Sequence, residues 1–273
     1  MNPMQKWSIA LLLTICAVWA SYFWLDRPIA VFAHERLRPL GIFTEIAELP
    51  ELMKPFLVVF FLAAALRALS GRPLARLLTV AGLAMASFAV AHAIKDQLKF
   101  AFGRTWPETW VRNNPSFIHD GVFGFFPFQG GQGFASFPSG HTTAICAVMS
   151  VLWICYPRFR LLYALVIAVV VIGIIGSDFH FLGDIIAGAF LGASIGWFTV
   201  VLWEYGERHV RGKALSRPFA DQVRGGNAGR NVKSATLGPP ETRAETDNYR
   251  PGDRGPASTS PHSVAREDTV DAP

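Results

Sequence analysis

The sequence predicts an all-α protein, a transmembrane bundle of six helices. Hydrophobic residues make up 51% of the 273 residues and charged residues only 16%, and the mean hydropathy is +0.31. The apolar residues are gathered in long runs, several of which approach the ~20 residues that a helix needs to cross a bilayer. We therefore expect a polytopic membrane protein.

The expected spans are, in chain order, residues 7–25, 55–69, 77–94, 141–156, 161–177 and 183–202. Aromatic residues at the end of the first run are typical of a membrane interface and not of a signal-peptide cleavage site. We therefore expect this run to stay in the protein as a transmembrane helix. Asp26–Lys54 mixes charges with three prolines, which predicts a loop containing a short surface helix around Ile42–Leu49. Residues 95–138 are rich in glycine and aromatic residues and predict a second long loop.

These boundaries divide the chain into three parts. Residues 1–50 hold the first transmembrane helix and an outer loop, residues 51–205 form the membrane core, and residues 206–273 form a cytoplasmic tail. From about Ala214 the composition turns to Gly, Pro, Arg, Thr, Asp and Ser. Such a segment cannot bury enough apolar surface to offset its chain entropy, so we expect the tail to be disordered.

Basic residues predict the orientation in the membrane. The dense clusters, which all fall on one side of six spans, are Arg67, Arg72 and Arg76, then Arg158 and Arg160, then residues 208–213, together with Lys6. Such clusters mark the cytoplasmic side, so residues 95–138 and 178–184 are expected to face outward. The same clusters account for the formal charge of +5, and no nucleic-acid partner is expected. All three cysteines lie inside apolar runs, which argues against a disulfide framework or a zinc site.

Pro138-Ser139-Gly140-His141 opens the fourth span. Ser139 is a preferred N-cap, and Gly140 lets the backbone approach a ligand closely. The free N–H groups of a helix N-terminus bind anions, and His141 in the first turn could give a proton to a bound phosphate.

His180 and Asp184 lie where the fifth span ends and the sixth begins. Four residues apart, they share a helix face, and the carboxylate can fix the ring tautomer so that the other nitrogen becomes a better nucleophile. Lys99 and Arg104 are cations of the kind that a phosphate needs. No span separates Lys99 from His141 and two spans separate His141 from His180, so all three should emerge on one membrane face.

With these residues the chain resembles the type 2 phosphatidic acid phosphatase (PAP2) superfamily, whose signature is Lys-x6-Arg-Pro, Pro-Ser-Gly-His and Ser-Arg-x5-His-x3-Asp. The likeness covers roughly residues 52–202 and implies a six-span bundle of the PAP2 / acid phosphatase–haloperoxidase type. It implies that His180 attacks phosphorus to form a phosphohistidine, that Asp184 orients His180, and that His141 protonates the leaving oxygen. The residues that would hold the phosphate are Lys99, Ser139 and the N–H of Gly140. The family needs no metal, so the resemblance implies no cofactor.

Two arginines of the signature are missing. Trp106 stands where the first motif has its arginine, and Ile174 stands where the third motif has its own. Arg104, two residues before Trp106, is a candidate to supply the lost charge to the phosphate. The other candidates are Lys95, Arg112 and His119.

We expect metal-independent hydrolysis of a lipid phosphate or pyrophosphate at the outer face of a bacterial inner membrane; the sequence does not name the lipid. Two alternatives stay open, a lipid phospho-headgroup transferase using the same His/His/Asp set and a non-catalytic headgroup-binding relative. The aromatic residues of the 105–137 loop either sit at the bilayer interface or line an entry path for an acyl or prenyl chain. Gly188, Gly192 and Gly196 form a small-residue stripe, used for packing inside the bundle or for a homodimer.

Overall fold

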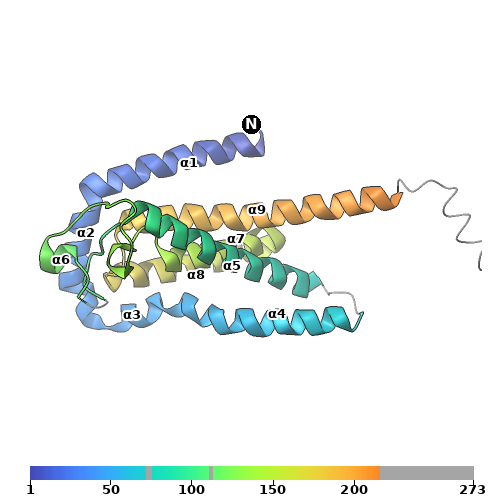
Figure 1. The fold of residues 1–273 in the computed structure, drawn as a ribbon, viewed down its shortest axis with the longest axis horizontal. Coiled ribbons are helices and arrows are strands. Elements are labelled where there is room, and N and C mark those ends of the chain that lie inside the picture. The colour runs from blue at the N-terminus through green and yellow to red at the C-terminus, as the bar shows by residue number, and fades with distance from the viewer. Residues whose placement is uncertain (72–75, 111–112, 216–273) are drawn as a thin grey trace, which may run out of the picture. The chain divides into compact units, whose positions relative to one another are not determined.

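The computed structural model describes residues 1–71, 76–110 and 113–215 (Figure 1). Within these ranges the regular elements are helices, and three isolated bridges in the long loop are the only strand-like pairings. Five helical stretches of this described part are long and apolar enough to cross a membrane: 3–40, 49–67, 76–102, 157–176 and 182–209. The remaining expected span, the fourth in chain order, is α7 (Gly140–Cys155), which has 16 residues and a length of about 24 Å. The all-α class is confirmed.

One helical stretch runs from Pro3 to Leu40, where we expected a span followed by a loop. Its parts are α1 (Pro3–Ala20), the π-helical η1 (Ser21–Leu25), α2 (Asp26–Phe32), the π-helical η2 (Ala33–Leu37) and the 3-10 turn η3 (Arg38–Leu40). The prediction that Asp26 begins a loop is therefore wrong. Asp26 is buried against an arginine instead of being solvated. The π-helical turn η1 precedes Pro28, which has no backbone N–H to donate to the helical hydrogen-bond ladder. Gly41, at φ 69°, ends the stretch.

The next helices lead to the long loop. The expected short helix is present as α3 (Ile42–Ala47), followed by the 3-10 turn η4 (Leu49–Leu52), α4 (Met53–Leu69) and α5 (Arg76–Phe102). The last of these continues eight residues beyond the predicted end at Ile94. Lys95 and Lys99 consequently lie on the final turns of a helix, one turn apart on the same face.

The pair α7 and α9 (Leu182–Leu215) forms the centre of the bundle. Gly188, Gly192 and Gly196 lie against α7, so closely that a Cβ atom at Gly192 would lie 2.3 Å from the backbone oxygen of Thr143. This stripe therefore packs inside its own chain, and the homodimer predicted through it is not supported. The physical reason is that the small residues already admit a neighbouring helix.

A second close helix contact joins α8 (Arg160–Gly176) to α3. Cβ atoms at Gly173 and Gly176 would lie 2.6 Å from Ile46 and 2.4 Å from Phe43. Gly173 and Ile174 fall where the family signature has Ser-Arg. Because Ile174 is buried in the apolar core under α3, that position has no room for a charged phosphate contact.

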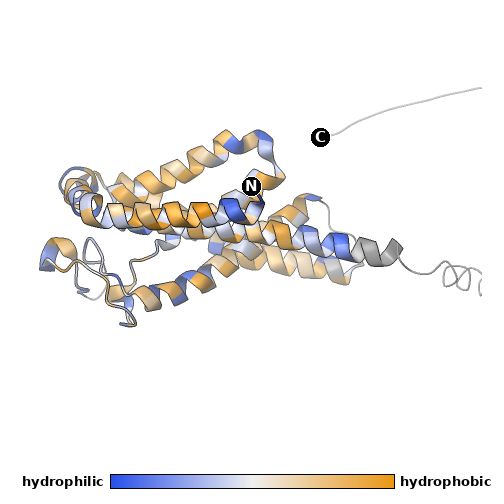
Figure 2. Ribbon diagram, turned by 90° about the horizontal axis from the view of Figure 1, so that it is seen from above, coloured by the Kyte–Doolittle hydropathy of each residue, from blue (hydrophilic) through white to orange (hydrophobic). Residues whose placement is uncertain are grey.

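Figure 1 shows α2, α6 (Phe117–Asp120) and the loop after α5 gathered at one end of the helices. Figure 2 shows apolar residues along the helices and hydrophilic residues at helix ends and in the loop. Helix α9 continues to Leu215, so the prediction that the disordered tail begins at residue 206 is wrong for residues 206–215. The rest of the predicted tail, and Arg72 and Arg112, lie outside the described residues.

Candidate active site

The ring of His180 is held from one side by two acceptors. Its Nδ1 lies 3.3 Å from Ser136 Oγ and 3.4 Å from Asp184 Oδ2, and the Ser136 hydroxyl donates to the same Asp184 oxygen at 2.5 Å. All three side chains are buried. A carboxylate and a hydroxyl that already donates to it can only accept from the ring, which places the proton on Nδ1 and leaves Nε2 as the free basic nitrogen.

Asp184 is itself fixed by a buried ion pair. Its Oδ1 accepts from Arg104 Nη1 at 2.5 Å, and Arg104 Nη2 donates to Asp26 at 2.5 Å. The second Asp26 oxygen accepts from Ser21 Oγ at 2.6 Å and from the N–H of Gly183 at 2.9 Å. The first helical stretch is thereby tied to the start of α9, one residue from Asp184.

The Arg104 guanidinium is enclosed as well as paired. Four aromatic rings lie within 5.5 Å of its central carbon, those of Tyr22, Phe123, Phe125 and Phe181. Burial alone would lower the pKa of Arg104, but the two carboxylates outweigh it and raise the pKa above the ordinary arginine value. The charge of Arg104 is thus committed to Asp184 and Asp26, and the side chain has no exposed surface from which to reach a phosphate.

Burial also acts on His180. It lowers the pKa of the imidazole, and the contact with Asp184 opposes this only in part. The ring is consequently neutral at neutral pH, which is the form that can attack an electrophile.

The N-terminus of α7 meets the last turn of α5. Ser139 caps α7 by accepting from the N–H of Thr142, and its own N–H donates to the backbone oxygen of Asp184 at 3.0 Å. A Cβ atom at Gly140 would lie 3.3 Å from the Lys95 side chain and 3.8 Å from Lys99 Nζ. The ammonium of Lys99 therefore stands beside the first turn of α7, so that free N–H groups and a cation face the same place.

His141 lies on the same turn, with its ring centroid 6.3 Å from that of His180. Its Nε2 is 3.7 Å from a Glu51 oxygen, and its ring stacks on Phe179. Its Nδ1 is buried without a hydrogen-bond partner. The two histidines of the sequence motifs are therefore brought together by the fold.

Trp106 occupies the position of the missing first-motif arginine. Its ring centroid lies 5.0 Å from that of His180, and Lys99 Nζ is 5.4 Å from the Trp106 ring. The indole N–H donates to the backbone oxygen of Gln132 at 2.7 Å. An aromatic face thus lines the side of the site where the signature has a guanidinium. His119 does not replace the guanidinium, because it contacts Glu108. Lys95 pairs with the exposed Asp96, and its side chain also lies beside Gly140.

Three polar residues of this site were missed by sequence reasoning: Asp26, Ser136 and Glu51. Asp26 carried a usable signal, because an acidic residue directly after a long apolar run is a functional candidate. Ser136 and Glu51 carried none, since a serine in a glycine-rich loop and a glutamate before a span are common.

An apolar cavity of about 640 Å³ lies beside the motif that contains Pro138. It is lined from three helices and the loop, by residues that include Val18, Tyr22, Leu98, Phe102, Phe137 and Phe190. Two of the loop phenylalanines that we expected either at the interface or along an acyl-chain path, Phe125 and Phe137, belong to this lining.

Comparisons with known proteins identify the family. The PAP2 superfamily matches residues 77–208. A lipid A 1-phosphatase from Rhizobium etli is 30% identical over 213 residues, 73% of this chain and 84% of the relative. A second lipid A 1-phosphatase, from Rhizobium johnstonii, is 31% identical over 211 residues, 73% of this chain and 80% of the relative.

One solved structure has the same fold. It is the crystal structure of the first transmembrane PAP2 type phosphatidylglycerolphosphate phosphatase from Bacillus subtilis, with a TM-score of 0.51 at 19% identity. The match covers 73% of this chain and 96% of that one. The chain belongs to the PAP2 superfamily. It is a multi-pass bacterial membrane protein and a phosphatase of the PAP2 type, as the sequence predicted.

Proposed function

We propose that this chain hydrolyses a lipid phosphate through a phosphohistidine on His180, without a metal ion in the reaction. The observation that carries the proposal is the fixed ring of His180, whose Nδ1 faces Ser136 and Asp184. That contact leaves Nε2 as the attacking atom. A buried nucleophile oriented by a carboxylate, with a second histidine 6.3 Å away between ring centroids, suits two-step phosphoryl transfer.

In the first step, Nε2 of His180 forms a bond to phosphorus while the bond from phosphorus to the lipid oxygen breaks. The proton for that oxygen comes from His141. Asp184 stabilises the positive charge that develops on the His180 ring. In the second step, water attacks the phosphohistidine, gives its proton to His141, and the N–P bond breaks to release phosphate.

The phosphate oxygens are held by Lys99, the Ser139 hydroxyl and the N–H of Gly140. Support comes from the position of the Lys99 ammonium beside the first turn of α7. Arg104, which the sequence suggested as a further phosphate contact, is buried between two carboxylates. We propose instead that Arg104 positions Asp184, and through it His180.

The substrate class that we propose is a phosphate monoester of an acylated lipid, with the 1-phosphate of lipid A as the first candidate. The named activity of both Rhizobium relatives supports it. So does the apolar cavity next to Pro138, whose volume of about 640 Å³ can take part of an acyl chain. We further propose that the site faces outward, since the clusters at Arg67/Arg76 and Arg158/Arg160 flank the other ends of the helices.

Phospho-headgroup transfer is the second candidate. It is favoured by Trp106, which presents an apolar face to His180 where the signature has a cation. An apolar wall can favour a lipid alcohol over water as acceptor in the second step.

The test is phosphate release by purified protein from a panel of lipid phosphates in EDTA, including lipid A 1-phosphate, beside His180→Ala. Release that persists in EDTA and is lost in the variant supports hydrolysis, and an acid-labile phosphoryl label on the wild type alone identifies the intermediate. A label without phosphate release, discharged by an added lipid alcohol, assigns the chain to transfer. Binding of lipid with neither label nor release assigns it to the headgroup-binding class.

A further inference from the structure

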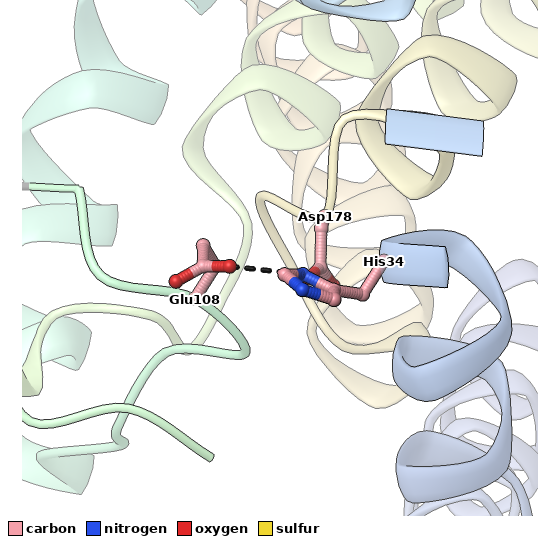
Figure 3. Close-up of side chains that lie close together, drawn as sticks. All are labelled: His34, Glu108 and Asp178. Carbon is pink, nitrogen blue, oxygen red and sulfur yellow. Dashed lines mark ion pairs between the residues drawn. The ribbon is translucent and has the colours of Figure 1, made fainter. Parts of the chain in front are cut away.

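A second cluster of titratable side chains forms where three distant segments meet. His34 comes from η2, Glu108 from the loop after α5, and Asp178 from the corner between α8 and α9 (Figure 3). One ligand atom of each residue lies within 4.8 Å of the other two. Glu108 is 0% exposed and Asp178 is 1% exposed.

The three side chains point toward one another. His34 Nδ1 lies 2.9 Å from Glu108 Oε2 and 3.3 Å from Asp178 Oδ2. The other Glu108 oxygen is already taken, by His119 Nε2 at 2.6 Å and by the N–H of Thr109 at 2.7 Å. Asp178 Oδ2 is buried and accepts no hydrogen bond. The cluster therefore contains a buried carboxylate oxygen that lacks a hydrogen-bond partner and lies close to two other potential ligand atoms.

Its charges are unbalanced. Two buried carboxylates face one guanidinium, that of Arg38, which contacts Glu108 Oε2. Burial and the nearby charge of Glu108 raise the pKa of Asp178 to about 8, while Arg38 opposes this. Without a cation, a proton has to relieve the repulsion between the carboxylates.

We propose that His34, Glu108 and Asp178 bind one divalent transition-metal ion of the Zn²⁺ class, separate from the phosphoryl-transfer site. An imidazole nitrogen with two carboxylate oxygens is a ligand set for Zn²⁺ or Mn²⁺, whereas Ca²⁺ and Mg²⁺ prefer oxygen alone. Ligands at Zn²⁺ distances in a tetrahedron are about 3.3 Å apart. His34 already meets its two partners at 2.9 and 3.3 Å.

Arg38 is the competitor for this ion, because it contacts the same Glu108 oxygen that would become a ligand. Arg38 Nη1 also lies 3.4 Å from His34 Nδ1, a second proposed ligand atom. A further partner is the Trp110 ring, whose centre lies 4.8 Å from the guanidinium carbon. Release from Glu108 would leave this contact in place. Removing the Arg38 charge should therefore strengthen metal binding, the opposite of removing a ligand.

The ion would stabilise the fold and would not contact the phosphoryl group. It would link the first helical stretch, the long loop and the corner whose residue 180 is the proposed nucleophile. Phosphate release in EDTA thus remains the expectation of the proposed function, and metal binding is measured independently of activity.

The experiment uses the full-length protein in detergent, stripped with EDTA, dialysed and titrated with ZnCl₂ by calorimetry, with CaCl₂ as a comparison. We expect a single Zn²⁺ per chain and a rise in Tm of several degrees on binding. His34→Gln and Asp178→Asn should each weaken Zn²⁺ affinity by about a hundredfold, and Arg38→Gln should strengthen it by about tenfold. Asparagine suits position 178, where φ is +61°.

The matched control is His209→Gln, which removes an exposed histidine from α9. It should bind Zn²⁺ as the wild type does. The absence of stoichiometric Zn²⁺ uptake by the wild type, or uptake unchanged in both His34→Gln and Asp178→Asn, would overturn the proposal in favour of a shared proton. The opposite responses of the Arg38 and His34 variants guard against a loss that merely reflects misfolding.

Discussion

Arg104 donates to Asp184 across 2.5 Å with neither side chain exposed to solvent. We propose that Asp184 orients the nucleophile, His180. The guanidinium of Arg104, which the sequence suggested for phosphate binding, therefore contacts Asp184 and not the phosphate. The same guanidinium reaches Asp26, which belongs to the first helical stretch and lies 78 residues away in the sequence. Buried pairs of this kind are costly to break from one side, because the remaining partner stays charged and unpaired.

Arg104→Lys tests whether this arginine positions Asp184 or binds phosphate. A lysine keeps one charge but cannot bridge both carboxylates in the fork geometry of a guanidinium. We expect kcat to fall by about a hundredfold while KM for the lipid phosphate changes by less than about threefold. A variant with intact kcat and a strongly raised KM would show that Arg104 contacts the phosphate instead.

Asp26→Asn tests the far end of the same chain of contacts. The variant keeps the shape but leaves Arg104 with one anionic partner, so we expect a loss of roughly 3 kcal/mol in the free energy of unfolding and a lower kcat. Thermal unfolding in detergent and steady-state kinetics measure the two effects. Glu35→Gln, an exposed acid of the same helical stretch, is the control and should leave both unchanged. Equal behaviour of the two variants would contradict the role of Asp26.

Trp106→Arg restores the residue that the family signature has at this position. A guanidinium there would stand near Lys99 and His180, where it can make a charge-assisted hydrogen bond to phosphate. We expect inorganic phosphate to inhibit the variant at about tenfold lower concentration than the wild type. Trp106→Phe keeps an aromatic ring without the charge and should not show this gain. Unchanged phosphate inhibition in Trp106→Arg would mean that position 106 faces away from the bound anion.

Part of the site follows from the sequence for a clear physical reason. A helix N-cap of the Ser-Gly-His type is a local pattern whose geometry is set by one turn of helix. His180 and Asp184 meet as the sequence predicts, but His180 lies in the bend before α9 and not on the same helix face. The meeting of His141 and His180 follows from counting spans. The contacts of Arg104 do not follow, because a cation near a phosphate motif can pair with any carboxylate that the fold brings to it.

The first helical stretch illustrates the same limit. Asp26 and Pro28 are local signals for a loop, and the sequence read alone predicts one. The structure overrides them, because Arg104 neutralises Asp26 in the interior and Pro28 falls in the first turn of α2, where a proline is tolerated. The partner that decides lies 78 residues away. An ion pair between residues far apart in the sequence, such as Asp26 and Arg104, is therefore a feature that sequence periodicity could not predict.

The pH dependence of stability should report Asp178 in protein kept free of divalent cations. Its pKa is raised from 3.8 to about 8 in the folded state, so the folded protein binds a proton that the unfolded chain has lost over this range. The free energy of unfolding should therefore fall as pH rises from about 4 toward 8, by at most about 1.4 kcal/mol per pH unit, and then level off. Unfolding curves in EDTA measure this. Asp178→Asn should lack this part of the slope, whereas Asp96→Asn, an exposed acid, should keep it.

Gly192→Ala tests the closest contact of the central helix pair. The added methyl group would lie 2.3 Å from the backbone oxygen of Thr143 and 2.9 Å from the backbone nitrogen of Ala147, so one helix has to move. We expect a loss of about 1–3 kcal/mol in the free energy of unfolding, the cost of overpacking a tight interior. Gly206→Ala lies on the same helix with open space around it and should be neutral or slightly stabilising, since alanine favours helix. Because α7 carries His141 and α9 carries Asp184, Gly192→Ala should also lower kcat, and a variant as stable and active as Gly206→Ala would contradict this packing.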